Sequence, residues 1–194
     1  MSRNYGPAVG EPPLLVDPRR WGSLIGLVGG SVFIGSYSSV LGSAVATITW
    51  TAGIVLAASI LFAHYVRPVS LGPLARPHPH ALAIYGGSVV GQLALIAAGT
   101  RALMATGHGG LQPALIASVV GLHFIPFAWA FREPMFLRLG GAVAGAVAVG
   151  LAAGALGLPH AAAAAAVLAG LTMLTIMATW ALGRFSPSVA KPRE

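Results

Sequence analysis

Six long apolar segments fill most of this 194-residue chain and decide what it can fold into. A helix needs about 20 residues to cross the hydrocarbon core of a bilayer, and each segment approaches or exceeds that length. The segments are rich in Ala, Gly and Leu and lack the alternation of polar and apolar residues that membrane strands show. The sequence therefore predicts an all-α protein, a six-helix transmembrane bundle. The spans lie near residues 21–37, 41–65, 80–100, 111–131, 136–157 and 161–183.

Composition supports a membrane location. Hydrophobic residues make up 56% of the chain and charged residues only 8%, whereas soluble domains carry about 25% charged residues. These values exclude a soluble enzyme, a disordered chain and a disulfide-stapled secreted domain.

The chain has no cysteine, which excludes disulfides, thiolate metal sites, cysteine nucleophiles and cysteine-linked lipids. The net charge of +7 comes from residues at the ends of apolar segments, so we expect contact with the lipid bilayer and not with nucleic acid.

The charge pattern predicts the orientation of the chain in the membrane. Residues 1–20 contain four prolines and no apolar period, so we expect an irregular tail there and a second tail over 184–194, with one domain of six spans over 21–183. With six spans, ten Lys and Arg residues share the side of both tails, and only Arg101 lies on the other side. Because cytoplasmic loops are enriched in Lys and Arg, we expect both termini in the cytoplasm. Aromatic residues expected at the same membrane surface are Trp21, Tyr65, Trp129 and Trp180.

Glycines recur at four-residue spacing in three of the spans. Such spacing places small residues on one helix face, where another backbone can approach closely. Two interpretations follow, which are packing within the bundle and a seam for a second copy or another membrane partner. The glycines concerned are Gly22, Gly26, Gly30, Gly87, Gly91, Gly141, Gly145, Gly150 and Gly154.

Polar residues within the predicted spans are few. No Asp, Glu, Lys or Arg falls in the middle of a span, and His123 is the titratable residue that lies well inside. Tyr85, Ser88 and Gln92 share one helix face at i, i+3 and i+7, at a depth similar to that of His123. Thr175 of the last span lies at that depth as well. We therefore predict a polar cluster of these five residues, either a solute or proton pathway or an interhelical hydrogen-bond set.

Pro126 follows His123 by three residues. It removes one backbone hydrogen bond of the helix, and we expect a kink beside the histidine.

The sequence lacks the residues that several kinds of membrane chemistry require. There is no midplane carboxylate for ion coupling, no midplane lysine for a Schiff base, and no H-E-x-x-H motif for a metalloprotease. We therefore predict no catalytic residue, no metal and no cofactor. A haem or metal site on His123 with His64, His78 and His80 is a weaker alternative. A bis-histidine haem needs two histidines at similar depth, and His64 is too shallow to match His123. Divalent metals want three or four ligands, and no acidic partner lies near the His78-x-His80 pair.

The stretch from Gly121 to Pro134 reads GLHFIPFAWAFREP and is the least generic part of the chain. Its G-L-H-F-x-P segment resembles one found in small uncharacterised bacterial membrane proteins with a similar number of spans. The resemblance covers about a dozen residues. It implies a bacterial inner (plasma) membrane and carries no activity.

Two main function classes fit the sequence. One is a small permease or channel-like protein for a neutral or weakly polar solute, which predicts a water-accessible cavity at His123. The other is a structural or regulatory subunit that packs against a partner through glycine-rich helix faces, which predicts a dry interior and an uncovered glycine face. A histidine-based haem or metal protein is the third and less favoured class, and the absence of acidic residues in the spans disfavours an enzyme.

Overall fold

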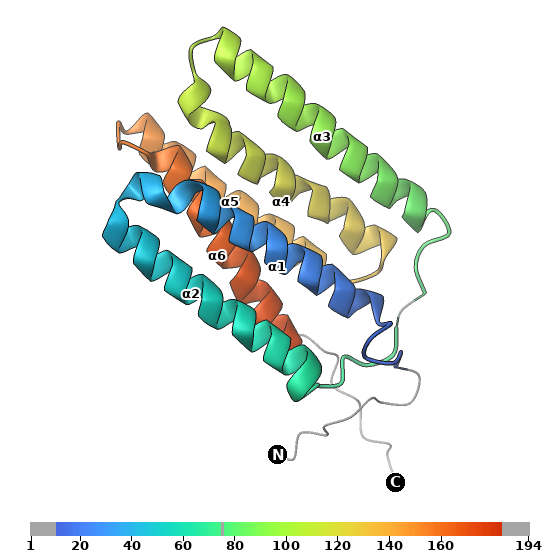
Figure 1. The fold of residues 1–194 in the computed structure, drawn as a ribbon. Coiled ribbons are helices and arrows are strands. Elements are labelled where there is room, and N and C mark those ends of the chain that lie inside the picture. The colour runs from blue at the N-terminus through green and yellow to red at the C-terminus, as the bar shows by residue number, and fades with distance from the viewer. Residues whose placement is uncertain (1–10, 75, 184–194) are drawn as a thin grey trace.

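The computed structural model describes residues 11–74 and 76–183, and it confirms the all-α expectation (Figure 1). Six helices in the described chain are long and apolar enough to cross a membrane. Short 3₁₀ turns at Ser38–Leu41 and Gly109–Leu111 and a π-helical turn at Phe62–Val66 extend them. The six helices are α1 (Pro18–Tyr37), α2 (Ser43–Leu61), α3 (Ala81–Ala105), α4 (Gln112–Ala130), α5 (Met135–Ala155) and α6 (Ala161–Ala181).

The observed helix ends differ from the predicted ones at α1 and α3. Helix α1 begins at Pro18, inside the segment that we expected to be an irregular tail. The reason is local, because the Asp17 carboxylate caps the first turn and proline is well tolerated there. Helix α3 runs five residues past the predicted end, so Arg101 lies within its last turns. Of the predicted tails, residues 1–10 and 184–194 lie outside the described residues.

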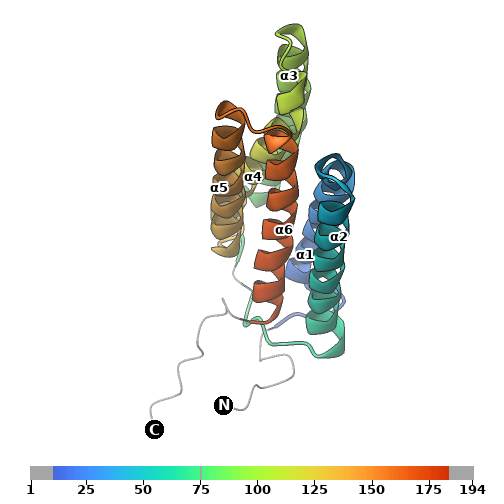
Figure 2. The same cartoon turned by 90° about the vertical axis from the view of Figure 1, so that its left-hand side faces the viewer.

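Helix α6 forms the centre of the bundle. It packs against α5, α1, α2 and α4, and Figure 2 shows it between α5 on one side and α1 with α2 on the other. Alanine and glycine dominate its first half, so its neighbours approach its backbone closely. The large buried side chains Met173, Leu174 and Met177 fill the space around its second half.

Helix α3 lies at one edge of the bundle. Among the long helices it packs mainly against α4 (Figure 1), and Ala81 is its only buried residue. Helices α1, α3 and α5 start at the same end of the bundle (Figure 1), so α3 and α5 run parallel to each other.

Candidate functional site

The most polar buried site lies where α1 begins, and we call its members, Glu11, Asp17, Arg19, Arg20 and His64, the ionic cluster. Its first element is the cap of α1. An Asp17 carboxylate oxygen accepts a hydrogen bond from the Arg19 backbone N–H at 2.9 Å, and the Arg19 guanidinium donates back to the same carboxylate at 2.9 Å. Asp17 is fully buried, so its charge is neutralised by arginine and not by water.

Arg20 joins α1 to the end of α2. Its side chain is only 1% exposed. One guanidinium nitrogen donates to the His64 carbonyl at 2.9 Å and lies 3.2 Å from His64 Nδ1, and the other donates to the Val69 carbonyl at 3.2 Å. His64 lies in the π-helical turn, where the regular i to i+4 hydrogen bonding of α2 gives way to wider turns. The arginine therefore binds backbone carbonyls at the point where the helix loses its regular bonding.

The hydrogen bond from Arg20 fixes the state of the His64 ring. A guanidinium only donates, so Nδ1 accepts, and Nε2 carries the ring proton. Nε2 is buried and has no hydrogen-bond partner among the described residues. The ring packs edge-on against Trp180 of α6, with centroids 5.8 Å apart. His64 therefore packs as a buried neutral side chain at the junction of α1, α2 and α6.

Glu11 completes the charge balance of the ionic cluster. Its carboxylate lies 3.8 Å from Arg19 and 3.7 Å from Arg20, and its own side chain is 2% exposed. The same carboxylate accepts hydrogen bonds from the Ser70 hydroxyl and the Leu71 backbone N–H, both at 2.8 Å. Two carboxylates thus balance two guanidinium groups, as burial of charge requires.

From the sequence, the arginines of this cluster served only as orientation signals, and the cluster itself was not predicted. One signal was available, because Asp17 directly before Pro18 and two arginines is typical of a capped helix start. A second signal is that Glu11 and Asp17, two of the four acidic residues of the chain, lie within ten residues of Arg20.

The predicted polar cluster is brought together only in part. Tyr85 of α3 stacks on Phe127 of α4 with ring centroids 5.3 Å apart, and His123 meets the same phenylalanine edge-on at 5.2 Å. His123 is half-buried, and its Nδ1 bonds the Val120 carbonyl of its own helix. Tyr85 and His123 therefore share an aromatic contact and not a hydrogen bond.

The other three members of the predicted polar cluster are Thr175, Ser88 and Gln92. The Thr175 side chain is exposed and donates to the Leu171 carbonyl of α6 at 2.8 Å. Ser88 and Gln92 are half-buried. No hydrogen bond joins these three side chains to His123 within the described chain. Pro126 lies inside α4, and its ring is exposed.

Glycine packing within the bundle occurs on α1 and on the second half of α5. A Cβ on Gly30 would lie 3.0 Å from the Gly170 carbonyl oxygen, and a Cβ on Gly26 would overlap Met177. On α5, a Cβ on Gly150 would overlap Ala165, and one on Gly154 would lie 3.5 Å from Ala161. These glycines allow α6 to approach α1 and α5 closely.

The remaining predicted glycines face open space. A Cβ at Gly22, Gly87, Gly91, Gly141 or Gly145 would meet no atom within 4 Å. On α3 and on α5 exposed alanines continue the face of these glycines, three and then four residues further on. We call the first set, Gly87, Gly91, Ala94 and Ala98, the α3 face. We call the second set, Gly141, Gly145, Ala148 and Ala152, the α5 face.

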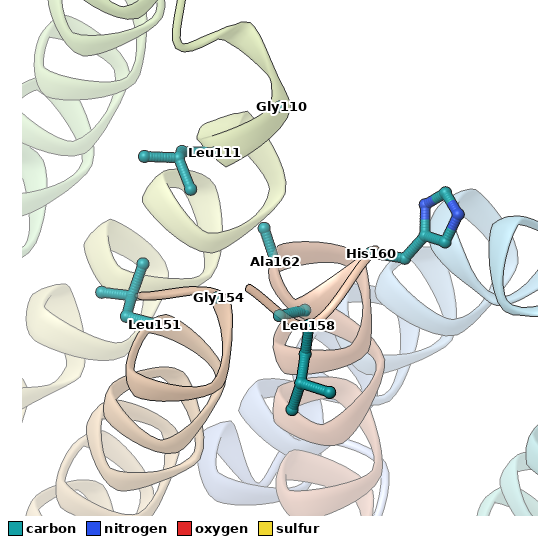
Figure 3. A pocket seen from close by; sticks show the side chains of 8 residues that line it. Gly110, Leu111, Leu151, Gly154, Leu158, His160 and Ala162 are labelled. Carbon is teal, nitrogen blue, oxygen red and sulfur yellow. The ribbon is translucent and has the colours of Figure 1, made fainter. Parts of the chain in front are cut away.

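Two hollows lie on the surface near the link between α5 and α6. One of about 370 Å³ is lined by residues that include Leu111, Leu151 and Ala162 (Figure 3), and one of about 310 Å³ is lined by residues that include Val149 and Leu168. His160 is among the residues that line the first hollow (Figure 3). Neither hollow is lined by His123, Tyr85, Ser88 or Gln92.

The other histidines named above lie in two separate places. His78 and His80 lie just before α3 with ring centroids 5.5 Å apart, and the His78 ring packs at a tilt against Trp129 with centroids 4.2 Å apart. His64 lies in the ionic cluster. Within 11–74 and 76–183, no three His, Asp or Glu side chains gather as metal ligands would.

Comparison of the chain with models of protein families, with curated proteins and with solved structures gave no match.

Proposed function

We propose that this multi-pass membrane protein is a structural subunit that assembles by packing α3 of one copy against α5 of a second copy. The observation that carries the proposal is that two helix faces of small residues, the α3 face and the α5 face, are both uncovered. Lipid supplies no hydrophobic force between helices, so helices associate where small residues let backbones come into van der Waals contact.

The two faces match each other in three respects. Each reads Gly, Gly, Ala, Ala at intervals of four, three and four residues, which is the spacing of a heptad seam. Gly87 follows the first residue of α3 by six positions, and Gly141 follows the first residue of α5 by six positions. Because α3 and α5 start at the same end of the bundle, two copies with the same orientation in a membrane would present the two faces in register.

A transport role has less support. A solute path at the predicted polar cluster would need a cavity that reaches His123, and the two hollows described above lie elsewhere. His123 instead packs among Phe124 and Phe127. We therefore favour assembly over transport. From the Lys and Arg distribution we further propose that both termini lie in the cytoplasm. The resemblance of the G-L-H-F-x-P segment to bacterial membrane proteins leads us to propose a bacterial inner membrane.

Disulfide trapping tests the contact directly, because the natural chain has no cysteine that would interfere. Two differently tagged copies are co-expressed, one with Ala94→Cys and the other with Ala148→Cys, and membranes are oxidised. We expect a disulfide-linked species that carries both tags, because cysteine Cα atoms must approach within about 7 Å for a bond to form.

The matched control uses Leu93→Cys in place of Ala94→Cys. Leu93 is 63% exposed and lies on another side of α3. We expect little linkage to Ala148→Cys in that pair. Equal linkage in both pairs, or no linkage in either, would contradict the proposed contact. Linkage of Ala94→Cys only to itself would show α3 against α3 and would overturn the pairing with α5.

A further inference from the structure

The carboxylate of Glu11 occupies a pocket that is built to hold an oxyanion. The Ser70 hydroxyl and the Leu71 backbone N–H donate hydrogen bonds to it, and the guanidinium groups of Arg19 and Arg20 lie in ion-pair contact with it at 3.8 Å and 3.7 Å. Arg20 is fixed independently of Glu11, because it is buried and also binds the His64 and Val69 carbonyls. Two guanidinium groups with a hydroxyl and a backbone N–H form a donor set that suits carboxylate and phosphate alike.

The start of α1 and the segment after α2 form the pocket, whereas Glu11, which fills it, belongs to neither. Arg19 and Arg20 belong to the first turn of α1, and Ser70 and Leu71 to the segment after α2. Glu11 lies in the irregular segment that precedes α1 (Figure 1). Among the described residues, removal of this carboxylate would leave Asp17 as the one carboxylate that pairs with the two arginines, so the ionic cluster would carry a net charge of +1. The Arg20 Nε atom is moreover buried without a hydrogen-bond partner among the described residues.

The pocket lies at the end of the bundle where headgroups of a bilayer would meet it. Helix α1 starts there, and the exposed rings of Trp21 and Trp129 lie near the ends of α1 and α4 that belong to this side, the position that tryptophan prefers at a membrane surface. Arg67 and Arg132 are exposed in the links on the same side. These charges attract anionic lipids to the surface that surrounds the pocket.

We propose that this pocket binds the phosphate of an anionic phospholipid headgroup and that Glu11 occupies it as an internal substitute when the lipid is absent. A phosphodiester carries one negative charge, as the Glu11 carboxylate does, so the exchange preserves the charge balance of the ionic cluster. This inference does not depend on the contact between α3 and α5.

The test compares lipid retention by the natural chain and by its variants, each purified in mild detergent. Retention is measured by native mass spectrometry during titration with phosphatidylglycerol. We expect Glu11→Ala to bind phosphatidylglycerol about tenfold more tightly than the natural chain. In the natural chain Glu11 fills the pocket for most of the time, and the apparent affinity of the pocket for lipid is reduced to the fraction of time that it is open. Glu133→Ala is the matched control, since it removes the same charge from a half-buried residue in the link between α4 and α5, near the same end. We expect no comparable gain from Glu133→Ala.

Three further arms make the result decisive. Glu11→Gln keeps an acceptor oxygen for Ser70 and Leu71 but removes the charge, and it serves if Glu11→Ala does not fold. Addition of Arg19→Ala to Glu11→Ala should abolish the gain. Titration with phosphatidylcholine and with inorganic phosphate separates the ligand sources. Equal retention by Glu11→Ala and Glu133→Ala would overturn the site, and a gain for inorganic phosphate without one for phosphatidylglycerol would overturn the lipid assignment.

Discussion

At the scale of single residues, Arg20 connects more parts of the molecule than any other polar side chain described above. It binds the π-helical turn, the segment after α2 and the Glu11 carboxylate from one buried position. Removal of one partner of a buried ionic set leaves the others uncompensated, which typically costs about 3–5 kcal/mol. The cost is large because the remaining charges stay in a medium of low polarity.

We therefore expect Arg20→Met to lower the free energy of unfolding by about 3–5 kcal/mol, measured by denaturant titration in detergent. Arg67→Met is the control, because Arg67 is exposed, and its loss should change stability by no more than about 0.5 kcal/mol. Combination of Arg20→Met with Glu11→Gln should cost less than the sum of the single changes, since both members of a pair are then neutral. Equal effects of Arg20→Met and Arg67→Met would show that the ionic cluster contributes no stability.

The sequence allows the cap of α1 to be predicted, but not the long-range contacts of the ionic cluster. Asp17 before Pro18 is a local signal that can be read from neighbours in the chain. The contact between Arg20 and His64 joins residues 44 positions apart, and that between Glu11 and Leu71 joins residues 60 apart. Such contacts depend on how α1 and α2 are rotated about their axes, which hydropathy does not specify.

At the scale of helices, glycines with the same spacing have two different uses. Gly30 lies where α1 crosses Gly170 of α6, and a Cβ on Gly170 would lie 2.6 Å from the Gly30 carbonyl oxygen. Gly91 of α3 has open space beside it. Spacing alone could not separate these cases, because it fixes which residues share a face and not what that face meets. The six spans themselves were predictable, since hydropathy summed over about 20 residues is a strong signal.

This difference predicts opposite results for one kind of substitution. Gly30→Leu should destabilise the monomer by about 1–3 kcal/mol or more, because the added side chain has no room between α1 and α6. Gly91→Leu should leave the stability of the detergent-solubilised monomer within about 0.5 kcal/mol of the natural value. Thermal unfolding in detergent at high dilution, where copies are separate, measures both. A large loss for Gly91→Leu under these conditions would mean that α3 packs differently from the structure.

At the scale of the whole molecule, the bundle has a packed centre and one loosely attached edge. Helix α6 is largely buried, whereas α3 packs mainly against α4 and buries only Ala81. The exposed apolar side chains of α3, such as Leu82 and Val90, suit contact with lipid. The small residues of the α3 face and the α5 face offer lipid little contact, and their better partner is another helix.

The number of copies per particle in a bilayer tests this account most directly. The protein carries one fluorophore and is reconstituted at low density in phospholipid vesicles, and photobleaching steps are counted. We expect more than one copy per particle for the natural chain and a single copy for the double variant Gly91→Leu/Gly145→Leu, which fills both faces. Val90→Leu, on an exposed part of α3 outside the α3 face, should keep the natural count. A single copy for the natural chain, or an unchanged count for the double variant, would contradict assembly through these faces.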